Sequence, residues 1–109
     1  MGENKVVRTN AEARITLNGN LVAATVPDLR TELKQLLSDG VTSLVIDLSN
    51  VTMVDSMGIG CLVAAHNSLK KNNGELAVTN ASADVFDLFT SMRLNHHFRV
   101  TGTGSERTE

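Results

Sequence analysis

The apolar run from Leu44 to Leu48 lies between two segments whose apolar residues recur at helical spacing. Before the run, leucines at positions 29, 33, 36 and 37 form one stripe of a helix, and after it positions 59, 62, 63, 65 and 69 do the same. Strand–helix–strand units imply right-handed crossovers and parallel pairing. Nearly continuous apolar character is typical of a strand covered on both faces, so we predict a central parallel strand over 44–48.

Both predicted helices have recognisable ends. Pro27 and Asp28 suit the first turn of the first helix, because proline lacks an N–H that would be unpaired there and an acidic side chain complements the helix dipole. Gly40 is placed to end this helix. The second helix is expected over 56–72, after a polar connection over 49–55.

Short strands are expected before the first helix. Residues 5–8 are typical of an edge strand, and residues 13–18 alternate apolar and polar side chains, which indicates a strand with one buried face. Asn18-Gly19-Asn20 has the composition of a tight hairpin turn. Residues 21–23 are therefore expected to return as the antiparallel partner strand.

The second half of the chain continues the alternation. We predict a strand over 76–78, a third helix capped by Ser82 and a last strand over 98–100. The inward face of the third helix is expected to consist of Val85, Phe86, Leu88, Phe89 and Met92. The predicted fold class is α/β, a single domain over 5–100 with a mixed β-sheet and helices packed mainly on one face. Residues 1–4 are expected to form an N-terminal tail and residues 101–109 a flexible C-terminal tail.

Composition narrows the classes of function. The net charge of −2 offers no basic surface, so no nucleic-acid partner is expected. No apolar run approaches the length of about 18 residues that a membrane span requires, and the N-terminus has neither the basic start nor the apolar core of a signal peptide. A single cysteine, Cys61, cannot form an internal disulfide and fits a reducing compartment. We therefore expect a cytoplasmic protein.

The residues that most often bind metals are expected to be structural here. His96 and His97 are adjacent, so on an extended segment they point to opposite faces and do not readily chelate one ion. Cys61 lies among apolar neighbours and is expected to pack as a small hydrophobic residue. His66 has no partner at a spacing that indicates catalysis. We predict no metal site and no cofactor.

The most informative element is the junction Asp55-Ser56-Met57-Gly58-Ile59-Gly60, where the polar connection meets the second helix. It places Ser56 at or next to the N-cap, where a serine oxygen accepts a bond from an unpaired backbone N–H and contributes about 1 kcal/mol. Capping alone is the usual role of such a serine. Glycines at 58 and 60, however, each cost the helix about 1 kcal/mol relative to alanine. We therefore expect another backbone or a partner to approach this turn closely.

The whole arrangement resembles the STAS domain, the fold of anti-sigma factor antagonists. A buried strand, a seven-residue connection, Asp-Ser and a Gly-x-Gly turn are the specific part of the resemblance. The pattern extends to Gly19-Asn20-Leu21-Val22 with Pro27-Asp28-Leu29-Arg30, and to Leu76-Ala77-Val78-Thr79-Asn80-Ala81-Ser82. The likeness covers about residues 5–100, which is nearly the whole chain.

In that family a partner anti-sigma factor kinase phosphorylates the serine of the Asp-Ser-x-Gly motif, which is Ser56 in this chain. The resemblance implies that the unphosphorylated chain binds a serine-kinase anti-sigma factor, that phosphorylation releases it, and that a serine phosphatase reverses the change. Asp55, Met57 and Gly58 would then flank the acceptor in the partner-binding surface, with Asp47 near it across the end of the sheet. Met57 stands where many relatives have a second hydroxyl residue.

Two other interpretations are open at this point. The alternative to the anti-sigma factor antagonist is a STAS module of a non-sigma partner switch, such as a stressosome-like scaffold or a regulator of biofilm or polysaccharide, or a subunit of a lipid-transport complex. A small enzyme is disfavoured because no acid–base pair or metal set accompanies Ser56, and Val54 stands where a hydrolase nucleophile elbow needs glycine. We therefore predict a regulatory protein in signal transduction, with no catalytic residue of its own.

Overall fold

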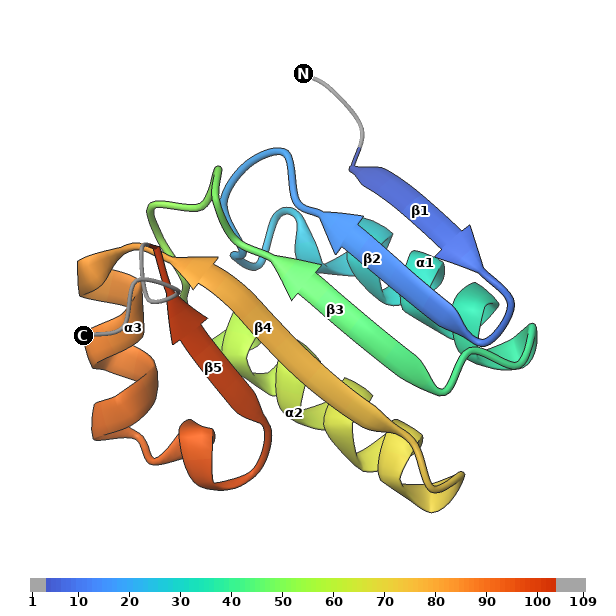
Figure 1. Cartoon of the computed structure of the whole chain (residues 1–109). Coiled ribbons are helices and arrows are strands. Elements are labelled where there is room, and N and C mark those ends of the chain that lie inside the picture. Colours follow the sequence, from blue (N-terminus) through green and yellow to red (C-terminus); the bar gives the residue numbers. More distant parts are fainter. Residues whose placement is uncertain (1–3, 104–109) are drawn as a thin grey trace.

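A five-stranded sheet forms the centre of the molecule (Figure 1) in the computed structural model, which describes residues 4–103. The strands lie side by side in the order β1 (Lys5–Thr9), β2 (Glu12–Thr16), β3 (Ser43–Asp47), β4 (Glu75–Ala81) and β5 (Arg99–Gly102). β1 and β2 are antiparallel, whereas the other neighbours are parallel. The predicted mixed sheet of an α/β domain is confirmed.

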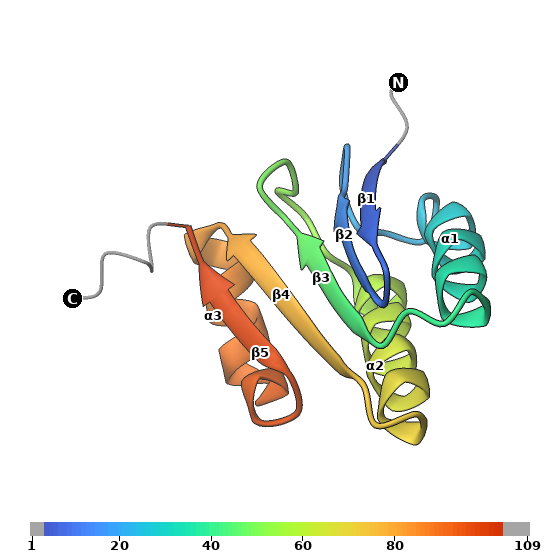
Figure 2. The ribbon, with the colours of Figure 1, turned by 45° about the vertical axis from the view of Figure 1, so that its right-hand side comes forward.

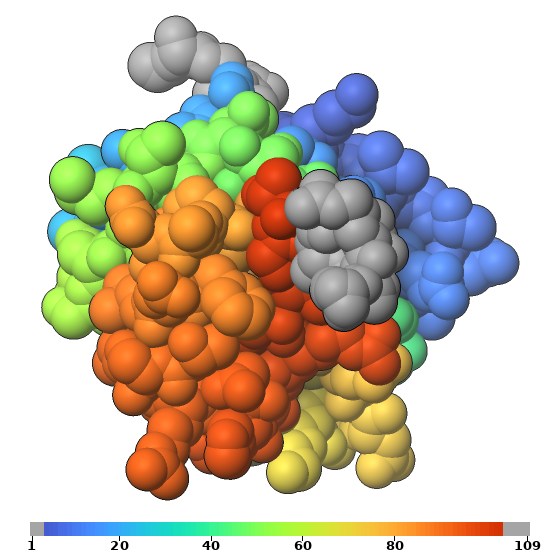
Figure 3. All heavy atoms as spheres, turned by 60° about the vertical axis from the view of Figure 1, so that its left-hand side comes forward, coloured from blue at the N-terminus to red at the C-terminus, as the bar shows by residue number. Residues whose placement is uncertain are grey.

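Three helices cover one face of this sheet. They are α1 (Val26–Ser38), α2 (Ser56–Lys71) and α3 (Ala83–Ser91), and a short 3₁₀ turn, η1 (Leu94–His96), leads into β5. Figure 1 shows α1 behind β2 and α2 behind β4, Figure 2 shows α3 behind β5, and Figure 3 shows α3 in orange packed beside β5 in red. The strand residues buried beneath the helices include Ala13, Ile15, Leu44, Ile46, Leu76 and Val78. The predicted packing of helices mainly on one face is confirmed.

The opposite face of the sheet carries no helix within residues 4–103. A row of side chains in register crosses this face, formed by Val7, Arg14, Val45, Ala77 and Arg99, and none of these residues is fully buried. The prediction that β3 is covered on both faces is therefore wrong for the described chain. The physical reason is that Ser43 and Asp47, the other outward residues of β3, are polar, so only Val45 would gain from a cover.

The antiparallel start of the chain is present, but its turn lies earlier than predicted. β1 and β2 are joined through Asn10 and Ala11, and Asn10 has a φ of 54°, a left-handed conformation that asparagine tolerates better than most residues. The predicted hairpin over 18–20 with a partner strand over 21–23 is wrong. That segment leads into α1 instead, and Leu21 forms only an isolated parallel bridge to the segment before α2.

The helix ends follow their sequence signals with one exception. Pro27 lies in the first turn of α1, and Gly40 follows the helix with a φ of +97°. Ser82 caps α3 by accepting a hydrogen bond from the N–H of Val85. Met92, predicted on the inward face of α3, is 48% exposed because it is the C-cap residue, where the chain leaves the helix.

The fold uses residues on both sides of the predicted limits at 5 and 100. The side-chain oxygen of Asn4 accepts a hydrogen bond from the backbone N–H of Asn18, at 2.9 Å. At the other end, β5 continues to Gly102. The rest of the predicted tails, residues 1–3 and 104–109, lies outside the described residues.

Candidate functional site

Asp55, rather than Ser56, caps the second helix. Its Oδ1 accepts a hydrogen bond from the N–H of Gly58 at 3.0 Å, and its Oδ2 accepts one from the N–H of Ala23 at 2.9 Å. Ser56 is therefore the first residue of α2 and is exposed. Within residues 4–103 no side chain or backbone group hydrogen-bonds its hydroxyl. The structural role predicted for a serine at this place is taken by its neighbour, which leaves the Ser56 oxygen available.

The charge of Asp55 is stabilised by backbone donors. The N–H groups of Gly58 and Ala23 hold the pKa of the Asp55 carboxyl below its ordinary value of 3.8, with a smaller contribution from the N–H of Met57. The turn therefore presents a carboxylate, not a carboxylic acid, beside Ser56 at neutral pH.

Removing the Asp55 carboxylate is expected to destabilise the fold in a pH-dependent way. Because its pKa is depressed in the folded state, the carboxylate contributes stability above its unfolded pKa, and this is lost as the pH falls through the folded value. Asp55→Ala should therefore lower the urea midpoint at pH 7, and the difference from wild type should shrink below about pH 4. Asp87→Ala removes an exposed carboxylate from α3 and serves as the control. A difference for Asp55→Ala that stays constant from pH 7 to pH 3 would contradict this role.

Gly58 allows another backbone to lie against the first turn of α2. A Cβ atom at this position would stand 2.3 Å from the carbonyl oxygen of Leu21 and 2.7 Å from its Cγ. The predicted close approach of another backbone to this turn is confirmed, and it takes place at Gly58; at Gly60 a Cβ would meet nothing within 4 Å in this chain. The two glycines, equivalent in the sequence, therefore have different surroundings.

Leu21 joins the start of α1 to the segment that precedes Ser56. Its N–H donates to the carbonyl of Met53 at 3.0 Å, and its own carbonyl accepts from the N–H of Asp55 at 3.2 Å. The Leu21 side chain is fully buried. Sequence reasoning did not assign Leu21 to this site, although Gly58 indicated that some backbone had to lie there. These contacts hold residues 53–55, the segment that leads to Ser56, against the start of α1.

Two exposed methionines add apolar surface near Ser56. Met53 is 59% exposed and Met57 is 48% exposed, and they lie on either side of Ser56 in the sequence. Exposed methionines are common at protein-binding surfaces, because their flexible side chains adapt to different partners. The site therefore combines a free hydroxyl, a carboxylate and apolar side chains, which suits the binding of another protein.

Comparison with known proteins places this geometry in a family. The model of the STAS domain matches residues 4–106. The chain belongs to the STAS domain family. An anti-sigma-B factor antagonist of Staphylococcus aureus is 32% identical over 75 residues, which cover 69% of each chain, so this STAS domain is also a member of the anti-sigma factor antagonist family.

Solved structures agree on the fold. The unphosphorylated form of the anti-sigma factor antagonist SpoIIAA matches with a TM-score of 0.79 at 21% identity, covering 95% of this chain and 91% of the other. The phosphorylated form of the Bacillus cell fate determinant SpoIIAA matches with a TM-score of 0.73 at 20% identity, covering 95% of each chain. The Staphylococcus aureus relative and the unphosphorylated SpoIIAA are both named as anti-sigma factor antagonists.

Asp47 lies at the end of β3 and not in the turn of the STAS domain that carries Ser56. Its side chain accepts hydrogen bonds from Arg14 at 2.6 Å and from the N–H of Ser49 at 2.8 Å, and the residue is only 7% exposed. Burial opposes its charge, but the bonds from Ser49, Arg14 and Asn80 hold its pKa below the ordinary value. Within the described chain none of its hydrogen bonds reaches residues 55–58. Asp47 fixes the start of the connection that leads to Ser56.

His66 and Cys61 of the STAS domain lie on α2 beyond Ser56, whereas His96 and His97 are exposed residues between α3 and β5. The ring of His66 lies 6.2 Å from that of His97 and 5.7 Å from that of Phe98, and burial, followed by Lys70 and His97, lowers its pKa. Burial raises the pKa of the Cys61 thiol, which is 2% exposed, so the predicted packing as a small hydrophobic residue is confirmed. Residues 4–103 contain no group of three or more side chains suited to a metal ion.

None of the helices in the described part of the chain is both long enough and apolar enough to cross a bilayer.

Proposed function

We propose that this anti-sigma factor antagonist is the phosphate acceptor of a serine-kinase anti-sigma factor, and that Ser56 is the residue modified. The observation that carries the proposal is the free, exposed hydroxyl of Ser56 at the first position of α2, left available because Asp55 supplies the cap. In this scheme the unphosphorylated chain binds the kinase and thereby frees a sigma factor. A serine phosphatase restores the binding form, and the cycle takes place in the cytoplasm.

A phosphate on Ser56 acts on the partner rather than on the fold. The phosphate adds about −1.5 to −2 charges and three acceptor oxygens, and the N-terminus of a helix stabilises such an anion. The chain as a whole carries a net charge of −2, so one phosphate roughly doubles it. Because the turn is already held through Asp55 and Leu21, we expect the phosphorylated domain to stay folded.

In this scheme the phosphate on Ser56 lies within the surface that contacts the partner. The Asp55 carboxylate is already negative beside Ser56, so the phosphate places a second, larger negative charge at the same point of the surface. An interface complementary to a neutral hydroxyl has no counter-charge for the phosphate, and burying a charged group without one costs several kcal/mol. The partner-binding surface of this proposal consists of Asp55, Ser56, Met57 and Gly58 together with Met53, and Asp47 supports it through Ser49.

Phosphate transfer with mass mapping tests the acceptor. We expect incubation with the serine-kinase anti-sigma factor of the same genome and ATP to place one phosphate on the peptide that contains Ser56. Ser56→Ala should remove this modification completely. Ser68→Ala removes an exposed serine from the same helix and should leave it unchanged. Phosphate on Ser56→Ala at the wild-type level, or none on the wild-type chain, would overturn the proposal.

A further inference from the structure

We propose that Asn20 is a positioning residue for Ser56: its side-chain oxygen holds the segment before α2 in the arrangement that a kinase accepts. This inference rests on the proposed function, because it concerns how the acceptor is presented.

Asn20 binds three donors of that segment with one oxygen. Its Oδ1 accepts hydrogen bonds from the N–H of Thr52 at 2.9 Å, from the Thr52 hydroxyl at 3.0 Å and from the N–H of Met53 at 3.1 Å. These donors lie more than thirty positions along the chain from Asn20 and only three or four before Ser56. A single side chain therefore satisfies consecutive backbone groups that would otherwise be left without a partner.

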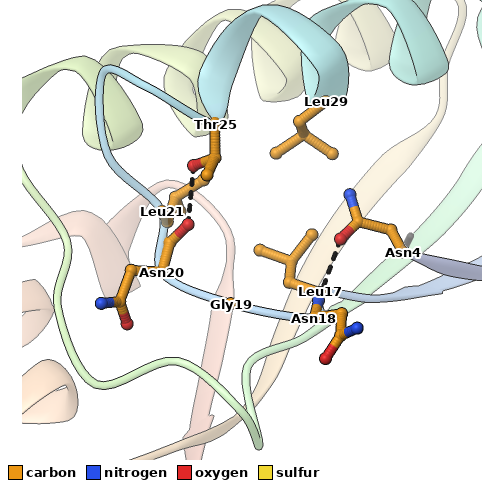
Figure 4. A pocket seen from close by; sticks show the side chains of 8 residues that line it. All are labelled: Asn4, Leu17, Asn18, Gly19, Asn20, Leu21, Thr25 and Leu29. Carbon is orange, nitrogen blue, oxygen red and sulfur yellow. Dashed lines mark hydrogen bonds between the residues drawn. The ribbon is translucent and has the colours of Figure 1, made fainter. Parts of the chain in front are cut away.

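The direction of the side chain agrees with this role. Figure 4 shows Asn20 beside a small pocket that includes Leu17 and Leu29 in its lining. The amide of Asn20 points away from that pocket, toward the ribbon that connects β3 to α2. Asn20 is thus one of the residues that line the pocket, but its side-chain amide reaches out of its own loop to the neighbouring one.

Asn20 is itself fixed at the start of α1. Its carbonyl oxygen accepts a hydrogen bond of 2.6 Å from the hydroxyl of Thr25, the bond drawn in Figure 4. The same hydroxyl accepts a hydrogen bond from the N–H of Val22, and Thr25 is the N-cap residue of α1. Through its backbone and its side chain, Asn20 therefore holds the segment that carries Met53 in place relative to the start of α1.

The hydrogen bonds of Asn20 are distinct from those that hold the first turn of α2 in the fold. The cap of α2 is formed by Asp55 with Gly58 and Ala23, and none of these bonds involves Asn20. Loss of the Asn20 oxygen leaves the cap and the Leu21 bonds in place, including the bond to the Met53 carbonyl, but removes the acceptor of the N–H groups of Thr52 and Met53. Because a displacement of about 1 Å in a reacting group can cost on the order of 100-fold in rate, we expect phosphate transfer to be more sensitive than stability.

Three variants test the inference. Asn20→Ala removes the acceptor oxygen, and Asn20→Asp keeps an oxygen in the same place. Asn18→Ala is the matched control on the same loop, because Asn18 is exposed and within the described residues only its backbone N–H is hydrogen-bonded, to Asn4. The measurements are amide hydrogen exchange at Thr52 and Met53, the urea midpoint, and kcat and KM for phosphate transfer from ATP by the serine-kinase anti-sigma factor.

Asn20→Ala is expected to lose exchange protection at Thr52 and Met53 and to lower kcat/KM by about 10- to 100-fold, in chains that are still fully folded. Asn20→Asp should restore the exchange protection and a kcat within about threefold of wild type, and Asn18→Ala should keep kcat/KM within about threefold of wild type. An unchanged kcat/KM in Asn20→Ala, or a loss of exchange protection and kcat that Asn20→Asp does not rescue, overturns the inference, whereas the proposed function stands as long as the wild-type chain is phosphorylated. A wild-type chain that accepts no phosphate overturns the proposed function itself, and the inference with it.

Discussion

Ser56→Asp is expected to weaken binding of the serine-kinase anti-sigma factor by about 100-fold or more, whereas Ser56→Ala keeps an affinity close to that of wild type. The aspartate places a fixed negative charge next to the Asp55 carboxylate, in a surface that otherwise presents a hydroxyl and two exposed methionines. Burying a charge in an interface that offers no counter-charge costs several kcal/mol, and each 1.4 kcal/mol is about tenfold in affinity. Titration calorimetry with the purified partner measures the effect.

The matched control for this charge is Ser68→Asp. Ser68 is exposed on the same helix, twelve positions beyond Ser56, so this variant has the same net charge without altering the site. It should bind the partner like wild type. If Ser68→Asp and Ser56→Asp weakened binding equally, the effect would come from net charge and the role of Ser56 would be refuted.

Gly58→Ala is expected to destabilise the domain by about 2 kcal/mol or more, although alanine is the better helix former by about 1 kcal/mol. The new Cβ would overlap the carbonyl oxygen of Leu21 at 2.3 Å, and this oxygen cannot move freely because it accepts the N–H of Asp55. Steric overlap with a held backbone atom outweighs the gain in helix propensity. Urea denaturation of the two proteins at pH 7 gives the difference in free energy of unfolding.

Gly60→Ala provides the opposite result in the same helix. A Cβ at Gly60 meets nothing within 4 Å, so the substitution should stabilise the domain by up to about 1 kcal/mol. The pair of variants therefore shifts stability in opposite directions. Equal shifts of the same sign would mean that the contact between Leu21 and the first turn of α2 does not exist in solution.

The parts of the fold that depend on local pattern could be predicted from the sequence. The helical stripe that begins at Leu29 and the apolar run over 44–48 together specify a strand between two helices, and the parallel pairing follows from the connection. The hairpin turn was misplaced because Asn18-Gly19-Asn20 and the true turn at Asn10 have similar local preferences. Only the pairing of β1 with β2, a contact between strands, decides between them.

The candidate site shows the same division between local and distant contacts. The junction at Asp55 and Ser56 was located correctly, but both residue types make good caps, and the bonds to Ala23 and Gly58 decide in favour of Asp55. Asn20 was not assigned to the site because its three bonds reach a segment more than thirty residues away. No periodicity or motif in the sequence records such a contact.

The most direct test of the central claim compares the affinity of the serine-kinase anti-sigma factor for the unmodified chain and for the chain phosphorylated on Ser56. We expect the phosphorylated chain to bind at least about 100-fold more weakly, with a thermal unfolding midpoint close to that of the unmodified chain. Equal affinities for the two forms would contradict the account, because the phosphate would then fail to switch the partner at the surface formed around Ser56.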